Sequence, residues 1–169
     1  MGFAGVVDKY LPTDDVCVMY VGANTGQELE CFYKHFNSAQ IYCFEANPSC
    51  ISFLEITVAN LKNRFSDKDI KVEVHNKAVC NNDNKILLYH DPSVDSHQSA
   101  TIMPLPKHSN KNQHHKAEIL THAIKVDTFV KEKNIDHIDL LYADVEGAQK
   151  ELLLGALSAL QKTDYLYIE

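Results

Sequence analysis

Short apolar runs alternate with amphipathic segments along most of this chain. The runs Val16–Val21 and Ile138–Ala143 are apolar at nearly every position, a pattern typical of strands that are buried on both faces. The segment Gly26–Phe36 instead places large apolar side chains at positions i, i+3, i+4 and i+7, the spacing of a helix that buries one face. Because strands and helices alternate, the pattern predicts an α/β fold with a doubly wound, mostly parallel sheet, helices on both faces and right-handed crossovers.

The same criteria place the remaining elements. Further strands are expected over Ile41–Phe44, Lys71–His75, Lys85–Tyr89, Ala123–Val126 and Tyr165–Ile168. Further helices are expected over Phe3–Leu11, Pro48–Leu61, Asp127–Lys133 and Ala148–Leu160. Asn47 and Asp127 are expected to cap the helices that they precede or begin, since Asn and Asp side chains accept hydrogen bonds from the first free amides of a helix.

Residues 81–122 fit this alternation least well. Three prolines interrupt regular structure there, and the stretch 107–116 is polar. We therefore expect a small β insertion with a mobile surface loop in this region, and a lead-in over residues 1–15. The chain has no internal repeat and no inter-domain linker, so residues 1–169 are expected to form a single domain.

The composition of the chain excludes several classes of protein. Its net charge of -7 argues against non-specific nucleic-acid binding, which needs a basic surface. No apolar run approaches the roughly 20 residues of a membrane span, and Met1–Tyr10 has no basic region typical of a signal peptide. The five cysteines are an odd number without a CxxC pair, so they are expected to be reduced thiols of a cytoplasmic protein and not a disulfide framework or a zinc ribbon.

Three turns carry the residues that could perform chemistry, and each follows a predicted strand. They are Gly22–Gly26, the turn that begins at Glu45, and Asp144–Gly147. Glycine allows a sharp turn and lets a ligand approach where a Cβ would block it, and Asn24 is a residue type that tolerates a left-handed conformation. Because the carboxyl ends of parallel strands line one crevice, these turns predict a ligand site at that edge of the sheet.

The turns favour a nucleoside ligand that has no pyrophosphate. Glu45 lies 23 residues after Gly22, an offset from which a carboxylate can accept hydrogen bonds from both hydroxyls of a ribose. A dinucleotide fingerprint that starts at Gly22 would need glycine at positions 24 and 27, where this chain has Asn24 and Gln27. S-adenosylmethionine has no phosphate and carries a sulfonium cation, which suits a crevice lined by carboxylates.

An ordered set of motifs adds to this interpretation. It comprises Val21–Gly26, Phe44–Pro48, Asn76–Val79, Ile138–Ala148 and Leu154–Ala156. In these motifs and their order the chain resembles the FkbM family of S-adenosylmethionine-dependent methyltransferases, within the class I Rossmann-like group, over Val18–Glu169. The resemblance implies O-methylation of a small or carbohydrate acceptor, commonly a sugar or polyketide hydroxyl.

The resemblance and the positions of the turns together give the candidate site residues. Candidate cofactor contacts are Gly22, Ala23, Asn24, Gly26, Glu45, Ala46, Asn76, Lys77, Ala78, Ser99, Asp144 and Val145. Asp144 is the first candidate for the general base and Glu146 the second, because the strand before them ends beside the expected methyl group. Either carboxylate could instead bind Mg²⁺, and no metal ligands are assigned. His97 is a candidate acceptor contact, whereas solvated surface positions are expected for His108, His114, His115 and His122.

The chain departs from the family pattern in two respects. Tyr20, Tyr142 and Gln149 stand where the family usually has an acidic residue, a lysine and a glutamate. The family's sheet resembles one of seven strands, and its final antiparallel pair is missing from this sequence. The last predicted strand, Tyr165–Ile168, would then lie at an open apolar edge, which predicts a homodimer sealed at this edge or a shortened chain.

Two other functions stay open at this point. A nicotinamide-dependent oxidoreductase would use the same type of sheet, and a non-catalytic module could bind S-adenosylmethionine or another protein without transferring a methyl group. In the simplest structural interpretation, Gly22 and Gly26 only permit a tight turn, Glu45 is a solvated turn residue, and Asp144 and Glu146 are favoured by a helix dipole.

Overall fold

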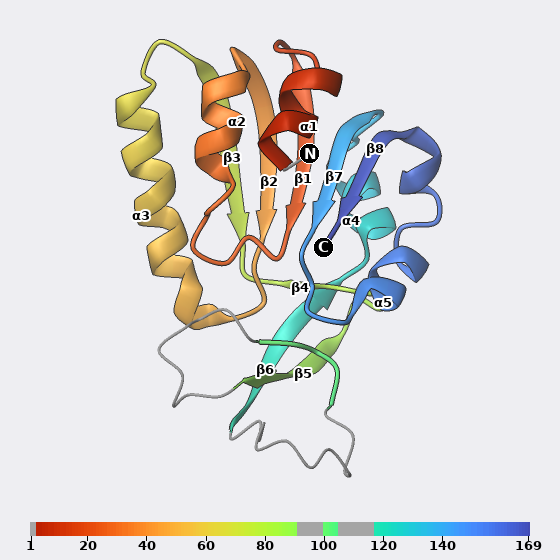
Figure 1. Ribbon diagram of the computed structural model, residues 1–169. Coiled ribbons are helices and arrows are strands. Elements are labelled where there is room, and N and C mark those ends of the chain that lie inside the picture. Colours follow the sequence, from red (N-terminus) through yellow and green to blue (C-terminus); the bar gives the residue numbers. More distant parts are fainter. Residues whose placement is uncertain (1–2, 91–99, 105–116) are drawn as a thin grey trace.

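The centre of the molecule is a five-stranded parallel sheet (Figure 1). The computed structural model describes residues 3–90, 100–104 and 117–169. In spatial order, the strands are β3 (Asp69–His75), β2 (Ser38–Phe44), β1 (Val16–Val21), β7 (Ile138–Ala143) and β8 (Thr163–Ile168). The expected α/β fold is confirmed. The strand order reverses between β1 and β7, and in such sheets the crevice at this point is the usual ligand site.

Two apolar layers hold the helices against the sheet. The helical elements are α1 (Phe3–Tyr10), α2 (Leu29–His35), α3 (Pro48–Arg64), α4 (Val126–Glu132), α5 (Gln149–Leu154) and the 3-10 helix η2 (Ala159–Lys162). Val18 and Tyr20 of β1 belong to the layer under α1, α2 and α3, whereas Met19 and Val21 belong to the layer under α4 and α5. Since both faces of β1 are covered, its sequence is an unbroken apolar run.

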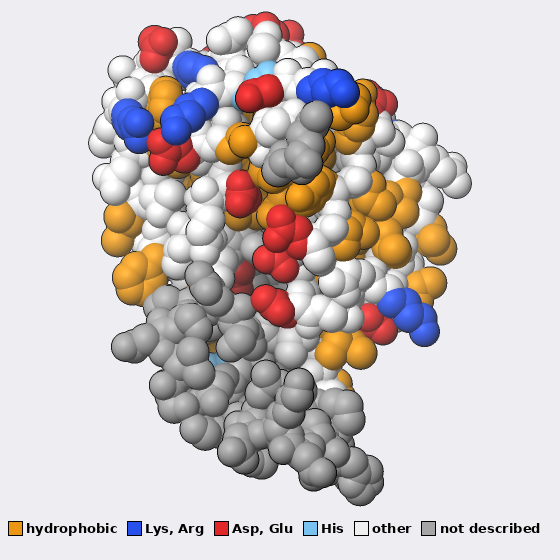
Figure 2. All heavy atoms as spheres, in the orientation of Figure 1, with side chains coloured by type: hydrophobic (Ala, Val, Ile, Leu, Met, Phe, Trp, Pro, Cys, Tyr) orange, Lys and Arg blue, Asp and Glu red, His pale blue; other side chains and the backbone are white. Residues whose placement is uncertain are grey.

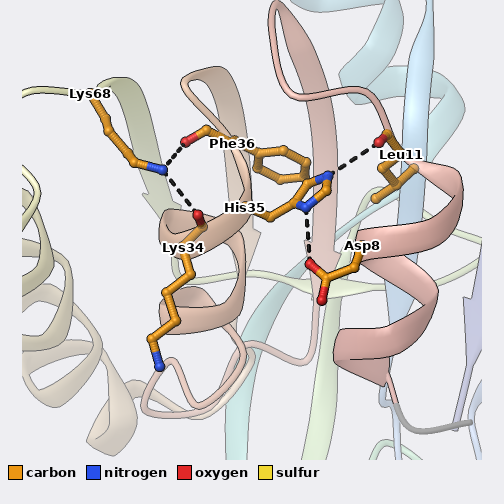
Figure 3. Close-up of polar contacts among 6 residues, drawn as sticks. All are labelled: Asp8, Leu11, Lys34, His35, Phe36 and Lys68. Atoms are coloured by element: carbon orange, nitrogen blue, oxygen red, sulfur yellow. Dashed lines mark hydrogen bonds and ion pairs between the residues drawn. The ribbon is translucent and has the colours of Figure 1, made fainter.

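Polar contacts fasten the ends of the first helices (Figure 3). The Nδ1 atom of His35 lies 3.0 Å from an Asp8 carboxylate oxygen, and its Nε2 atom lies 3.1 Å from the carbonyl oxygen of Leu11. Lys68 donates to two carbonyl oxygens at the end of α2, at 2.7 and 3.1 Å. The final carbonyls of a helix have no partner inside it, so the lysine satisfies them and anchors α2 beside β3.

A small second sheet lies at the carboxyl ends of the main strands (Figure 1). It contains β4 (Ala78–Val79), β6 (Ala117–Ile124) and β5 (Lys85–His90), in that spatial order. The strand expected at 85–89 is confirmed, whereas the one expected at 123–126 is only partly right, since β6 runs over 117–124 and α4 begins at 126. Two neighbouring positions of β6 are opposite to the apolar pattern, since Thr121 is 4% exposed and Leu120 is 60% exposed.

The helix expected over Ala148–Leu160 is shorter in the structure. It ends at Leu154, and η2 follows separately. Gly155 lies against the backbone of Cys80, where a Cβ would come within 2.0 Å of the Cys80 carbonyl oxygen. This close approach fastens the end of α5 to the strand β4, and it gives a physical reason for the glycine in the motif Leu154–Ala156.

The two expected helix caps have different outcomes. Asn47 caps α3 as predicted, because its side-chain oxygen accepts the backbone N–H of Ser49 at 3.0 Å. The expected cap by Asp127 is wrong, since Lys125 is the N-cap residue of α4. The Asp127 carboxylate instead accepts the backbone N–H of Ser158 at the start of η2, at 3.0 Å. Its partner lies in a distant part of the chain, so local spacing could not reveal it.

Candidate functional site

The turn after β1 is held against the end of β2 by backbone hydrogen bonds. The amides of Gly22 and Ala23 both donate to the carbonyl oxygen of Phe44, each at 2.9 Å. Gly22 has φ +76°, and a Cβ on it would lie 1.7 Å from the carbonyl oxygen of Asp144. Asn24 has φ +48°, in the left-handed region as predicted. Glycine is therefore required at position 22 because the turn after β7 occupies the space of a side chain.

Gly26 has a packing role in the structure. Its φ is +89°, and a Cβ would lie 2.9 to 3.1 Å from side-chain atoms of Leu29, Leu54 and Thr57. It is therefore the close approach of α2 and α3 that needs a small residue here. A turn over residues 27–28 follows, and α2 begins at Leu29, later than expected.

Glu45 connects the glycine turn to the start of α3. Its side chain is buried, and its carboxylate accepts the backbone N–H of Asn24 at 2.7 Å and that of Asn47 at 2.6 Å. Burial raises the pKa of this carboxyl above its usual range, the backbone hydrogen bonds oppose the shift, and nearby Asp144 adds to it. A carboxylate offers about four acceptor positions, so the backbone amides of Asn24, Asn47 and Ala46 leave room for a ligand hydroxyl.

Asn76 fixes the Glu45–Ala46 turn from the side of β3. Its amide group donates to the carbonyl oxygens of Glu45 and Ala46, at 2.8 and 3.2 Å. Thr121 of β6 donates to the same Ala46 carbonyl at 3.1 Å. Asn76 is exposed and is not part of the lining of either cavity, and its two hydrogen bonds orient Glu45 and Ala46, which do line one.

The turn after β7 carries the two candidate catalytic carboxylates. The Asp144 amide donates to the carbonyl oxygen of Val21 at 3.0 Å, which docks this turn on the end of β1. Glu146 and Gly147 both have positive φ, at +45° and +94°. The Glu146 carbonyl accepts the hydroxyl of Thr101 at 2.7 Å. A positive φ is costly for glutamate, so the surroundings must hold this turn in place.

Two adjoining cavities lie at this edge of the sheet. The smaller one measures about 70 Å³, and the larger, more polar one about 280 Å³. Ligand pockets usually provide roughly 300 to 1,000 Å³, so a nucleoside-sized ligand would have to span both. The two cavities share Gly22, Asn24, Asp144 and Glu146. The smaller cavity adds Glu45, Ala46, Lys77, Ala78, Val145, Leu88 and Ala100–Ile102 among others.

The structure thus brings most of the predicted cofactor residues together. Ala23, Gly26 and Asn76 support the turns without lining either cavity, whereas the others in the described chain line the cavities. Ser99 and His97 lie outside the described residues, as do His108, His114 and His115. Leu88 and Thr101 line the smaller cavity, and no motif singled them out.

The polar cavity is strongly acidic. Its carboxylates are Glu28, Asp144, Glu146 and Glu169. Figure 2 shows Asp and Glu side chains gathered down the middle of the face with no Lys or Arg between them. Burial raises the pKa of Glu28, Asp144 and Glu146, and neighbouring carboxylates raise each of them further. A cation in this cavity would relieve the mutual repulsion.

Tyr20 and Tyr142 form one wall of the acidic cavity. Both are buried, and their ring centroids lie 5.1 Å apart at an interplanar angle of 83°. Tyr142 also stacks on Tyr167 at 5.4 Å. Burial raises the pKa of Tyr20 far above its usual range, so its hydroxyl stays neutral at physiological pH. These positions, where the family pattern has charged residues, belong to an aromatic cluster in this chain.

One group of side chains elsewhere in the described chain has the spacing of metal ligands. It consists of His137, Asp139 and Asp164, at the amino ends of β7 and β8 and so at the opposite end of the sheet from the cavities. The Nε2 atom of His137 lies 3.6 Å from Asp139 and 3.2 Å from Asp164. His137 and Asp164 are more than half exposed, and exposed acidic groups of this kind are common without a metal ion.

Comparison with known proteins decides the family. The family model described as "Methyltransferase FkbM domain" matches residues 21–169. This chain belongs to the FkbM methyltransferase family. The matched region contains all three turns that line the cavities, from Gly22 to Gly147.

Two relatives agree with the family assignment. The 2-O-methyltransferase NoeI of Sinorhizobium fredii (strain NBRC 101917 / NGR234) is 23% identical over 167 residues, which cover 94% of this chain and 65% of NoeI. The crystal structure of the methyltransferase FkbM from Methylobacillus flagellatus KT has a TM-score of 0.58 and 16% identity, over 94% of this chain and 34% of that one. The similarity to the crystal structure establishes the fold. The chain spans about two thirds of the length of NoeI and about one third of the length of the crystallised protein.

No helix within residues 3–90, 100–104 and 117–169 is long and apolar enough to cross a lipid bilayer. The homodimer expected at β8 stays a prediction. The structure does place β8 at the edge of the sheet, paired only with β7 among the described strands.

Proposed function

We propose that this FkbM domain binds S-adenosylmethionine and transfers its methyl group to a hydroxyl of a small or carbohydrate acceptor. The observation that carries the proposal is the crevice at the point where the strand order reverses, in which Glu45 and Asp144 flank the glycine turn. The name of NoeI specifies O-methylation, which supports oxygen as the atom that accepts the methyl group.

The residues present fit this cofactor. The buried Glu45 carboxylate suits a ribose hydroxyl, since its acceptor positions are not all taken by backbone amides. Ala78, Leu88 and Ile102 supply apolar surface in the smaller cavity for a base. The acidic cavity beyond Gly22 suits the ammonium and sulfonium charges, because the described residues that line it include four carboxylates and no basic side chain.

The same residues argue against a nicotinamide dinucleotide. Among the described residues that line the two cavities, Lys77 is the one basic side chain, against five carboxylates. A pyrophosphate placed beside Asp144 and Glu146 would be repelled, and Asn24 stands where a dinucleotide fingerprint has its second glycine. The charges of the described lining residues therefore favour a sulfonium cofactor over a dinucleotide.

When bound, S-adenosylmethionine supplies a methyl group that is activated by the positive sulfur. The protein's first contribution is alignment, which can provide roughly 7 to 11 kcal/mol when two reacting groups are held in line. Asp144 lines both cavities and can take the proton of an acceptor hydroxyl on its carboxylate oxygen. The raised pKa of Asp144 makes it a better proton acceptor than an exposed aspartate, and such a base typically contributes 10²- to 10⁴-fold in rate.

Glu146 is the second candidate for the base. It also lines both cavities, and its pKa is raised by burial and by Asp144. Asp144 or Glu146 would be the residue to hold a Mg²⁺ ion, whose positive charge would lower the pKa of these carboxyls. Activity that survives EDTA would remove the ion from the mechanism.

Calorimetry with S-adenosylhomocysteine and with NADH tests the cofactor. We expect one equivalent of S-adenosylhomocysteine to bind in the micromolar range and NADH to give no signal. Asp144→Asn should then retain binding and lose methyl transfer by 10²-fold or more. If NADH bound and S-adenosylhomocysteine did not, the proposal would be wrong. If S-adenosylhomocysteine bound and no hydroxylated acceptor were ever methylated, a non-catalytic binding module would be the better description.

A further inference from the structure

Two threonine hydroxyls, one from Thr101 bridged to β5 and one from Thr121 in β6, hold two carboxylate-bearing turns of the main sheet. Thr101 donates to the Glu146 carbonyl at 2.7 Å, and Thr121 donates to the Ala46 carbonyl at 3.1 Å. These turns follow β7 and β2, which are separated by β1. Neighbouring strands are about 4.8 Å apart, so the two held turns lie roughly 10 Å from one another across the crevice.

The two threonines are connected to each other by backbone hydrogen bonds. Thr121 lies in β6 and pairs with Ile86 of β5. Further along β5, Tyr89 exchanges two backbone hydrogen bonds with Thr101, at 2.8 and 3.0 Å. A continuous ladder therefore runs from the Ala46 turn through β6 and β5 to the Glu146 turn.

Each hydroxyl is fixed in direction. The Thr101 oxygen also accepts the backbone N–H of Met103 at 3.1 Å, so it serves as donor and acceptor at once. Thr121 is buried at 4% exposure in a strand whose neighbouring leucine is outside. The hydrogen bond to the Ala46 carbonyl explains why a polar residue occupies this buried position of β6.

We propose that Thr101 and Thr121 are positioning residues, and that the small sheet is a clasp that sets the separation between Glu45 and the Asp144–Glu146 turn. A ligand that spans both cavities contacts both turns, so the separation between them decides how well it fits. Glu146 has a positive φ, which is costly for a glutamate. Its turn is therefore expected to depend more on the hydrogen bond from Thr101 than the Ala46 turn depends on Thr121. The effect on ligand affinity rests on the proposed function, whereas the effect on hydrogen exchange does not.

Valine and serine substitutions separate the hydroxyl from the methyl group. Thr101→Val keeps the shape and removes both hydrogen bonds, and Thr101→Ser keeps the bonds and removes the methyl group. Thr128→Val is the matched control. The Thr128 hydroxyl donates to the Asp83 carboxylate at 3.0 Å, and neither residue lines a cavity. Thr121→Val and Thr121→Ser test the other end of the clasp.

Hydrogen exchange of residues 144–148 is the first measurement. We expect faster exchange there in Thr101→Val, wild-type exchange in Thr101→Ser, and no change in Thr128→Val. Unchanged exchange in folded Thr101→Val and Thr121→Val would overturn the clasp, whether or not the protein binds S-adenosylhomocysteine.

Affinity for S-adenosylhomocysteine is the second measurement. Loss of one such bond should weaken binding by about 5- to 10-fold in either valine variant, with recovery in the serine variants. The double valine variant should lose less than the product of the single losses, because one broken end already frees the turn that the ladder holds. Multiplicative losses would show two independent contacts and contradict the clasp. If the wild type bound no S-adenosylhomocysteine, the proposed function would fail while the exchange experiment still decided the clasp.

Discussion

At the scale of single residues, the glycine turn shows what sequence reasoning can and cannot reach. The left-handed Asn24 and the need for glycine at position 22 follow from residue type and motif. The reason for Gly22, a carbonyl oxygen from residue 144, depends on a contact 122 positions away. The hydroxyl contacts of Thr101 and Thr121 leave no pattern in the sequence, because a threonine that reaches a distant carbonyl looks like any other threonine.

Gly22→Ala should disrupt both the fold and the ligand site. The new Cβ would lie 1.7 Å from the Asp144 carbonyl oxygen, so the turn after β7 must move. Gly147→Ala is the matched control, since it also has positive φ but meets its nearest atom at 4.0 Å. We expect a loss of about 1 to 2 kcal/mol in unfolding free energy for the control, and about 3 kcal/mol or more for Gly22→Ala. Urea denaturation of both variants measures this, and equal losses would show that the close approach has no energetic role.

Asp144→Asn should stabilise the ligand-free protein. Burial and the charge of Glu169 raise the pKa of Asp144, so the native state keeps this proton to higher pH than the unfolded chain does. The destabilisation by the ionised Asp144 carboxylate is absent below the unfolded-state pKa of about 3.9, and it is complete above the raised native-state pKa. We therefore expect a Tm increase of about 1 to 3 °C at pH 7.5 and less at pH 4.5.

Glu118→Gln is the control for this measurement, because Glu118 is exposed on β6. It should change the Tm little at either pH. A destabilised Asp144→Asn at pH 7.5 would mean that the carboxylate stabilises the free protein, contrary to the raised pKa.

At the scale of helices and strands, the buried parallel strands were the most predictable. β1 and β7 begin and end where the apolar runs do, since both of their faces are covered. The prediction was poorest at β6, where a threonine is buried and a leucine is exposed, and at α5, which a close backbone contact ends early. In both cases a tertiary contact overrides the local pattern.

Asp127→Ala should loosen η2 from α4. The Asp127 carboxylate accepts the backbone amides of Ser158 and Ala159, at 3.0 and 2.8 Å. Loss of such capping bonds typically costs about 1 kcal/mol in unfolding free energy. Asp136→Ala is the control, because Asp136 is an exposed carboxylate near the same surface, and it should cost less than 0.5 kcal/mol by the usual ~0.5 kcal/mol limit for surface substitutions. Chemical denaturation measures both, and indistinguishable midpoints would remove the capping role.

At the scale of the whole molecule, the arrangement of the main sheet follows from general rules. Alternating strands and helices with right-handed crossovers give a doubly wound parallel sheet, and its reversal point predicts where a ligand binds. The sequence predicted the small sheet less completely, because its strands are short and partly polar. The acidity of the second cavity could not be read from the sequence either, since Glu28 and Glu169 meet Asp144 only through the fold.

The edge of the main sheet gives the last prediction. β8 pairs with β7 on one side, and its Tyr165, Leu166 and Ile168 are 38%, 44% and 36% exposed. Among the described strands β8 has no partner on its other side, and an apolar edge strand is a template for pairing with a second copy. We expect this chain to form dimers as its concentration rises, and Leu166→Lys to suppress them by placing a charge on the edge. Ile56→Lys is the matched control, because Ile56 is 58% exposed on α3, where the backbone is already paired within the helix. Light scattering over a concentration series measures the oligomeric state of each protein. If Leu166→Lys formed dimers as readily as the wild type, the contact would lie elsewhere. If the wild type stayed monomeric at every concentration, the dimer prediction would be wrong.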